Sequence, residues 1–233
     1  MFTSFSNSDS TAAFPNRKGS PQATFSLNFP DPKDQWLKAE FGKVLQFNDP
    51  NWGAAIKKVS QDYFKEYRSV SKDEAYYDAT EGGGFLSYTK NTFGYIKYNE
   101  KGFVVIDQFR DDYTGGAHGY YFSTMHCFDV KEKRKLKLDD IVTLDSVALQ
   151  PIVERFFREQ YDLKPGEGLS KVLFDSHLPA SANFYFNSNG LSFIYNPYEV
   201  ASYAQGQLMV FLPFKDIKQH LTPSFRKRMG MDQ

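Results

Sequence analysis

The sequence predicts an α+β fold in which antiparallel sheets pack with a few helices. Two observations lead to this prediction. Residues 75–130 contain short β-branched and aromatic runs separated by Gly- and Asn-containing turns, a pattern typical of an antiparallel meander. On both sides of this region, apolar residues recur at the spacing of an amphipathic helix.

The N-terminal part of the chain predicts an arm, a strand and two helices. Residues 1–21 are rich in Ser and Asn and indicate a flexible arm. Residues 23–28 alternate as a strand does, and Pro30 and Pro32 should end it. Residues 35–45 predict a short helix. A second helix should begin at Asp49 and Pro50, because Asp caps free amides and Pro suits the first helical position. Its apolar face predicts core packing by Trp52, Ala55, Ile56, Val59 and Tyr63.

The middle and C-terminal parts predict a meander, a long helix and a hairpin. Strands are expected over residues 75–80, 85–90, 92–98, 103–110 and 120–130, with turns at residues 81–84 and 99–102. Residues 138–142 resemble a connecting turn. An apolar stripe then predicts a helix with Pro151 in its first turn. A hairpin over residues 183–195, a strand over 208–212 and a closing helix over 214–220 complete the prediction.

We expect two small modules that share one compact body. Residues 22–128 should form the N-terminal module, residues 129–222 the C-terminal module and residues 223–233 a tail. The reason is that neither half has enough predicted strands to bury both faces of its own sheet. Composition also shows no linker between the two halves.

Composition restricts the partners and the location. The chain has 233 residues and equal numbers of basic and acidic residues, 28 each, which argues against nucleic acid as the main partner. A local basic cluster is interpreted as a solvated hairpin end and comprises Lys131, Lys133, Arg134, Lys135 and Lys137. The lone Cys127 cannot form an internal disulfide, and no apolar run is long enough to span a bilayer. Because the first residues do not resemble a signal peptide, the chain is either cytosolic or a mature fragment of an exported protein.

Two loops have unusual compositions. Residues 111–122 contain two carboxylates, a Gly-Gly pair that permits positive φ, one histidine and four aromatic residues. Residues 196–206 form a long aromatic loop between two predicted strands. Tyrosine suits sugars, peptides and protein partners because it has a flat apolar face and a polar tip. The candidate binding residues are therefore Tyr113, Gly115, Gly116, His118, Tyr120, Tyr195, Tyr198, Glu199 and Tyr203.

No motif in the sequence indicates catalysis, a metal or a cofactor. Zinc-ligand spacings, a phosphate-binding loop and a GxSxG motif are missing, so we expect no catalytic residue, metal or cofactor. One alternative stays open, a cell-wall glycan hydrolase that uses Asp111 or Asp112 with His118. Adjacent aspartates in a strand point to opposite faces, however, so they are not an acid/base pair by themselves. A charged strand end that blocks edge pairing is the other interpretation.

Three stretches occur together in one order: Asp112-Tyr-Thr-Gly-Gly-Ala-His-Gly119, Leu138-Asp-Asp140 and Asn196-Pro-Tyr-Glu-Val-Ala-Ser-Tyr-Ala-Gln-Gly206. In combination they resemble the paired extracytoplasmic domains of PdaC-like peptidoglycan deacetylases and of RsiV-like, lysozyme-sensing anti-sigma factors. The resemblance covers about residues 23–221. It implies an exported lipoprotein or membrane-anchored protein of the periplasm or cell surface.

The resemblance also has limits. The sequence contains no deacetylase catalytic domain, no sigma-binding segment and no transmembrane helix, so catalysis and sigma-factor control are not carried over. What the resemblance implies is a non-catalytic envelope module. Such a module would bind lysozyme, another envelope protein or peptidoglycan fragments.

Overall fold

The computed structural model describes residues 1–72 and 86–232, and it has the α+β fold that the sequence predicts. The chain forms two compact units. Unit 1 comprises Met1–Tyr95 and Gln108–Tyr121, and unit 2 comprises Ile96–Asp107 and Phe122–Gln233. The strand expected over residues 75–80, the turn at residues 81–84 and residue 85 lie outside the described residues.

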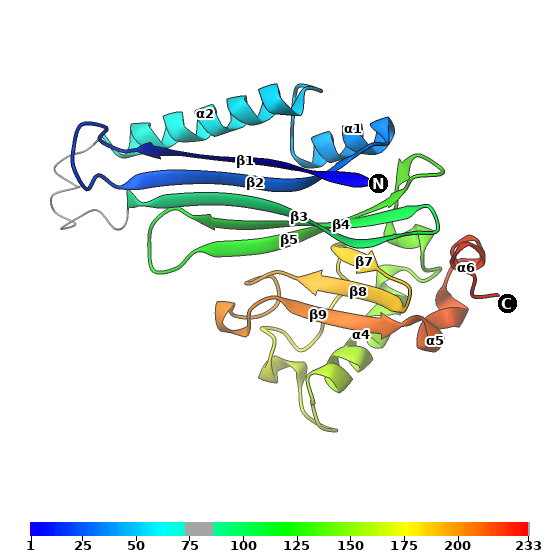
Figure 1. The fold of residues 1–233 in the computed structure, drawn as a ribbon. Coiled ribbons are helices and arrows are strands. Elements are labelled where there is room, and N and C mark those ends of the chain that lie inside the picture. Colours follow the sequence, from blue (N-terminus) through cyan, green and yellow to red (C-terminus); the bar gives the residue numbers. More distant parts are fainter. Residues whose placement is uncertain (73–85, 233) are drawn as a thin grey trace. The chain divides into compact units, whose positions relative to one another are not determined.

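Among the described residues the larger sheet has the strand order β1-β2-β3-β4-β5-β6 (Figure 1). Its strands are β1 (Phe2–Ala12), β2 (Gln22–Pro32), β3 (Tyr88–Glu100), β4 (Phe103–Tyr113), β5 (Tyr120–Asp129) and β6 (Arg134–Lys135). The β3–β4 turn consists of Lys101 and Gly102, both with positive φ, which is the backbone of a tight hairpin turn. The β2–β3 pair is parallel rather than antiparallel, because a long crossover that includes helices at residues 35–44 and 52–70 connects these strands.

The observed units do not divide after residue 128. Strands β3, β4 and β5 each contribute residues to both units. The first half of β4 carries Phe103 and Val105, which belong to the core of unit 2, whereas Gln108 donates to the Val44 carbonyl oxygen within unit 1. Each of these long strands contributes residues to both units, so no single cut in the sequence separates the two units.

The N-terminal segment is a strand and not a flexible arm. Strand β1 pairs with β2 in antiparallel register from Phe2↔Pro32 to Ala12↔Gln22. The Phe2 ring stacks on Phe41 at 6.2 Å between centroids, and the Phe5 ring meets Trp52 edge-on at 5.4 Å. Composition misled the prediction because backbone pairing and two aromatic anchors stabilise an otherwise polar segment.

Strand β2 also continues through Pro30 and Pro32, which were expected to end it. Pairing of β2 with β3 stops at Asn28↔Phe93, so both prolines lie where β2 has one open edge. A residue without an N–H group is tolerated at such an edge. Gly94 allows the close approach, because a Cβ atom there would lie 2.5 Å from Cδ of Pro30.

Two helices, α1 (Gln35–Val44) and α2 (Trp52–Val70), pack on β1 and β2 within unit 1 (Figure 1). The cap of α2 is Asn51, whose side chain accepts from the Ala54 amide at 3.1 Å; the predicted start at Asp49 and Pro50 was therefore wrong. The strands predicted over residues 85–90 and 92–98 are one strand, β3, because no residue near Asn91 breaks the extended backbone.

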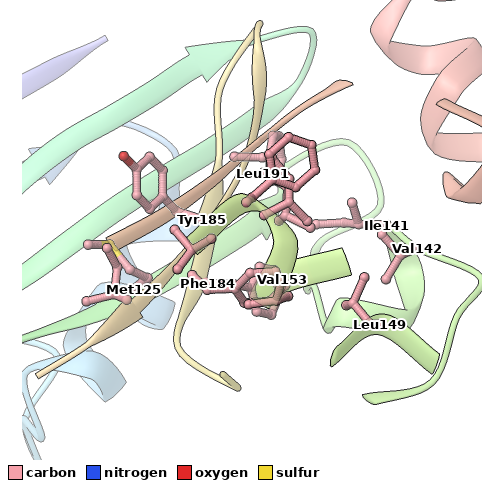
Figure 2. Packing of buried hydrophobic residues seen from close by; sticks show 14 of the residues in the cluster. Met125, Ile141, Val142, Leu149, Val153, Phe184, Tyr185 and Leu191 are labelled. Atoms are coloured by element: carbon pink, nitrogen blue, oxygen red, sulfur yellow. The ribbon is translucent and has the colours of Figure 1, made fainter. Parts of the chain in front are cut away.

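Unit 2 contains the second sheet, with the order β7 (Phe184–Phe186), β8 (Gly190–Tyr195) and β9 (Leu208–Pro213), all antiparallel. Helix α4 (Ser146–Gln160) packs on β9. Figure 2 shows part of the resulting core, where Val153 of α4 lies near Phe184 of β7 and Leu149 of α4 lies near Val142. The predicted hairpin, the strand and the apolar helix are confirmed.

Two details of unit 2 differ from the prediction. Pro151 lies inside α4 and not in its first turn, because the helix starts at Ser146. Packing of the apolar face holds the helix despite the lost backbone hydrogen bond. The closing helix is a short α5 (Phe214–Ile217) followed by a 3-10 turn, Lys218–His220.

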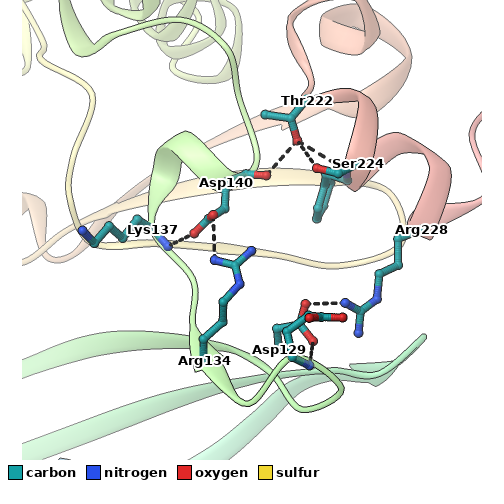
Figure 3. A network of polar contacts seen from close by, with 9 residues as sticks. Asp129, Arg134, Lys137, Asp140, Thr222, Ser224 and Arg228 are labelled. Atoms are coloured by element: carbon teal, nitrogen blue, oxygen red, sulfur yellow. Dashed lines mark hydrogen bonds and ion pairs between the residues drawn. The ribbon is translucent and has the colours of Figure 1, made fainter.

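The expected C-terminal tail is also folded. It forms α6 (Pro223–Met229), whose Phe225 and Met229 side chains are buried. Figure 3 shows polar contacts at both ends of this helix: the Thr222 hydroxyl, at its start, donates to the Asp140 carbonyl oxygen at 2.8 Å, and Arg228, in its last turn, pairs with Asp129. The Asp140 carboxylate accepts from the Lys137 amide and from Arg134, both at 2.7 Å. The Leu-Asp-Asp stretch therefore helps to build the fold.

Candidate functional site

The glycine loop joins β4 to β5 in unit 1. Gly115 and Gly116 have φ of +92° and +95°, which is one of the uses that a Gly-Gly pair permits. The Tyr113 hydroxyl donates to the Gly116 carbonyl oxygen at 2.9 Å, and His118 Nδ1 lies 2.9 Å from the Gly119 carbonyl oxygen. Tyr120 is exposed at the start of β5. The loop is therefore organised by its own side chains and presents His118 and Tyr120 to solvent.

Asp111 and Asp112 lie in β4 and not in the loop, because this strand extends to Tyr113. The Asp112 side chain accepts from Arg110 at 3.1 Å, and the Asp111 residue is exposed. The hydrolase alternative, which needs one of these carboxylates together with His118, stays a prediction. Within residues 1–72 and 86–232, no group of three or more His, Cys, Asp or Glu residues could hold a metal ion.

A small pocket lies beside the start of this loop, in unit 1. Its volume is about 190 Å³. Helix α2 contributes Tyr63 and Tyr67, which are four residues apart and thus share a helix face. The other lining residues are Glu66, Val70, Tyr88, Thr89, Lys90, Asp112 and Thr114. The sequence predicts Tyr63 as a core residue and does not single out Tyr67. The repeat of tyrosine at helical spacing is the pattern that identifies both as neighbours on one helix face.

The second predicted loop, in unit 2, contains one buried and two accessible tyrosines. Tyr195 is only 2 % exposed, and its hydroxyl donates to the Pro179 carbonyl oxygen at 2.7 Å. Burial raises the pKa of Tyr195. As a binding candidate Tyr195 was wrong, because its ring belongs to the core. Tyr198 is 53 % exposed, with its ring 5.6 Å from that of partly exposed Tyr203.

This loop has a fixed backbone. Glu199 Oε2 accepts from the Asn196 amide at 2.7 Å, which closes the turn at the start of the loop. The Tyr198 amide donates to the Ala201 carbonyl oxygen at 3.1 Å, and Tyr198 has a φ of +69°. A non-glycine residue in this region is uncommon, and tertiary contacts must hold it there.

Another pocket, about 370 Å³ in volume, lies in unit 2 next to this loop. Two asparagines in its wall satisfy the free edge of β5. The Ser123 amide donates to Asn196 Oδ1 at 2.8 Å, and the Met125 amide donates to Asn183 Oδ1 at 2.8 Å. Both asparagine side chains also donate to the Ser123 carbonyl oxygen. Asn196 and Asn183 are therefore structural groups whose hydrogen bonds are used within the fold.

His126 and Cys127 lie on β5 near this pocket and are buried. Burial and the positive charge of Lys135 lower the pKa of the His126 imidazole to about 4, and Lys135 Nζ lies 3.0 Å from its Nδ1. Burial raises the pKa of the Cys127 thiol to about 12, which disfavours the reactive thiolate. Neither side chain has the properties of a nucleophile or a neutral-pH acid. The basic cluster around Lys135 is exposed, as the sequence predicted.

A family model described as a protein of unknown function, DUF3298, matches residues 139–215. No curated protein matches the chain. No helix among the described residues has the length and apolar character needed to cross a membrane.

Two solved structures of DUF3298 family proteins resemble this chain. One, from Bacteroides fragilis NCTC 9343, is 25% identical with a TM-score of 0.84, over 99% of this chain and 97% of that chain. Another, from Pseudomonas aeruginosa PAO1, is 13% identical with a TM-score of 0.68, over 97% of this chain and 96% of that chain. The resemblance to PdaC-like and RsiV-like proteins stays a prediction. The chain is thus similar to DUF3298 proteins in fold over nearly its whole length and in sequence over residues 139–215.

Proposed function

We propose that this chain is a non-catalytic, extracytoplasmic module that binds a wall-associated partner, either lysozyme or a peptidoglycan fragment. The observation that carries the proposal is the pair of accessible tyrosines, Tyr198 and Tyr203, on a loop with a fixed backbone. Tyrosine contributes a large amphipathic contact area at a low cost in side-chain entropy, and it is enriched among the residues that dominate binding.

The structure of the loop supports this role. Glu199 closes its first turn, and Tyr198 is held at positive φ, so its ring is positioned before a partner arrives. A preorganised loop loses less conformational freedom on binding than a loose one. The buried Cys127 and the low pKa of His126 fit a module that binds and does not react. The extracytoplasmic location rests on the motifs that resemble exported envelope proteins.

The proposal is tested by calorimetry of the full chain against lysozyme and against soluble muropeptides. Tyr198→Ala and Tyr203→Ala should each weaken binding by about 1–2 kcal/mol without unfolding the protein. Tyr95→Ala is a matched control, because Tyr95 is 50 % exposed and lies in unit 1. It should leave the affinity unchanged.

A turbidity assay on purified cell wall separates binding from hydrolysis. The binding module should leave the suspension turbid. Clearing that is lost in Asp111→Asn or His118→Ala would establish the hydrolase alternative. If neither lysozyme nor muropeptides release heat, the named partners are wrong.

A further inference from the structure

The pocket of unit 1 that Tyr63 and Tyr67 line contains polar groups that the fold does not use. The Tyr63 hydroxyl, the Tyr67 hydroxyl and Asp112 Oδ1 are buried, and none has a hydrogen-bond partner among the described residues. The Tyr67 residue is only 1 % exposed. Leaving such groups unpaired costs about 1–3 kcal/mol each. Three of them at one pocket indicate a ligand that completes their hydrogen bonds.

The unpaired groups comprise both donors and an acceptor. Burial first, and then the negative charge of Asp112, raises the pKa of Tyr63 to about 12, so its hydroxyl keeps its proton at neutral pH. Burial also raises the pKa of Tyr67. Asp112 binds Arg110 through Oδ2, which leaves Oδ1 as an acceptor. A complementary ligand therefore accepts from a tyrosine hydroxyl and donates to a carboxylate oxygen.

The pocket walls combine aromatic rings with balanced charges. The Tyr67 and Tyr88 rings lie 5.2 Å apart between centroids, and Lys90 Nζ lies 5.5 Å from the centre of the Tyr63 ring. Two carboxylates, Glu66 and Asp112, are matched by Lys90 in the wall and by Arg110 on Asp112. This balance favours neither a cation nor an anion.

We propose that this pocket binds a neutral sugar ring. Each sugar hydroxyl donates and accepts, so one hydroxyl can bridge Tyr63 and Asp112, while apolar C–H faces pack on tyrosine rings. An ammonium ion would leave the tyrosine donors unpaired, and a carboxylate would be repelled by Asp112. The volume of about 190 Å³ is below the ~300–1,000 Å³ of sites for drug-sized ligands, which suits one ring.

This site is distinct from the surface in the proposed function. All of its lining residues belong to unit 1, whereas Tyr198 and Tyr203 belong to unit 2. The ring could be a free monosaccharide or one unit of a glycan chain. Both sources share the same chemistry, and the experiment compares them.

The test is saturation-transfer NMR and titration of the full chain with glucose and N-acetylglucosamine, each beside its short β-1,4-linked oligosaccharide. Glucosamine and glucuronate are controls with the same ring but a positive or negative charge. We expect at least one neutral sugar to bind with a dissociation constant of about 1 mM, and the charged sugars to bind at least tenfold more weakly. An oligosaccharide that binds more tightly than its monosaccharide indicates a glycan chain as the source.

Two variants locate the binding. Tyr63→Phe and Asp112→Ala should each weaken sugar binding at least fivefold, whereas Tyr95→Phe, which removes a hydroxyl outside the pocket, should have no effect. Without sugar, Tyr63→Phe should melt at the same or a higher temperature, because it removes an unpaired buried group. The sugar-induced rise in melting temperature should be lost in this variant.

Three results would overturn the proposal: no binding of any neutral sugar at about fifty times the expected dissociation constant, equal binding of neutral and charged sugars, or binding unchanged by both pocket variants. Tyr198→Ala should leave sugar binding in this pocket intact. If the proposed function is wrong, the chain binds a monosaccharide but neither lysozyme nor muropeptides. If the sugar site is wrong, the chain binds one of those partners but no monosaccharide.

Discussion

The pocket beside Asn196 and the pocket beside Tyr63 differ in whether the fold uses the polar groups in their walls. In unit 2, Asn183 and Asn196 bond the edge of β5 at Ser123 and Met125. In unit 1, the Tyr63 hydroxyl and Asp112 Oδ1 are buried without a partner among the described residues. The first arrangement holds the strands together, whereas the second is available to a ligand. Volume alone would favour the pocket beside Asn196 as the ligand site, because it is larger than the pocket beside Tyr63.

Two tyrosines show the same contrast with one kind of side chain. Burial raises the pKa of both Tyr63 and Tyr195. The Tyr195 hydroxyl donates to the Pro179 carbonyl oxygen, whereas the Tyr63 hydroxyl has no partner in the described part of the chain. A raised pKa thus reports burial in both cases, and only the hydrogen bonds separate a structural tyrosine from a candidate ligand-binding one.

The largest effect should come from Asn196→Ala, which tests whether the pocket of unit 2 is structural. The substitution leaves the buried Ser123 amide without its acceptor and removes the contacts with Glu199 and Gln207. We expect the free energy of unfolding, measured in urea, to fall by about 2–4 kcal/mol. Asn189→Ala, at an exposed hairpin position, is the control and should change little. A loss no larger than in this control would contradict the structural role.

The next effect concerns His126, which extends the comparison to a buried titratable group. Its folded pKa of about 4 is below the usual 6.5, so the unfolded state binds more protons between these values. Stability is therefore fully present above about pH 6.5 and is lost as the pH falls towards about 4. We expect the free energy of unfolding to fall by about 2–3 kcal/mol over this range, more than in His126→Gln. Equal pH dependence of the two proteins would refute this assignment.

A smaller effect is expected for Gly116→Val in the loop beside the pocket of unit 1. Nothing lies within 4 Å of a Cβ atom built at this position, so the cost comes from the φ of +95° alone. The free energy of unfolding should fall by about 1–2 kcal/mol. Ala117→Val is the control, because Ala117 is exposed in the same loop and has no positive φ. Similar melting temperatures for the two variants would show that the backbone is not constrained.

The smallest effect tests the comparison most directly, because the same kind of substitution, Tyr to Phe, is made once in each unit. Tyr195→Phe leaves the Pro179 carbonyl oxygen without its donor and should cost about 1–2 kcal/mol of unfolding free energy. Tyr63→Phe, measured without ligand, should cost nothing or stabilise the protein. A loss for Tyr63→Phe as large as that for Tyr195→Phe would show that the Tyr63 hydroxyl has a partner in the free protein.

The sequence by itself determined features that depend on neighbouring residues. The hairpin around the Asn-Ser-Asn-Gly turn and the apolar face of α4 were both predicted correctly. In each case the pattern extends over a few residues, so turn geometry or helical periodicity determines the structure locally. The α+β class follows from the same local patterns.

Only the tertiary structure decided which side chains and strands find distant partners. Strand β1 exists because it pairs with β2 and places Phe5 against Trp52, which its polar composition does not reveal. Tyr195 is buried while Tyr198, three residues on, is exposed, because one ends a central strand and the other lies in the loop beyond it. The pocket of Tyr63 and Asp112 arises where a helix meets a strand far along the chain. Such contacts depend on packing between elements, which local sequence patterns do not encode.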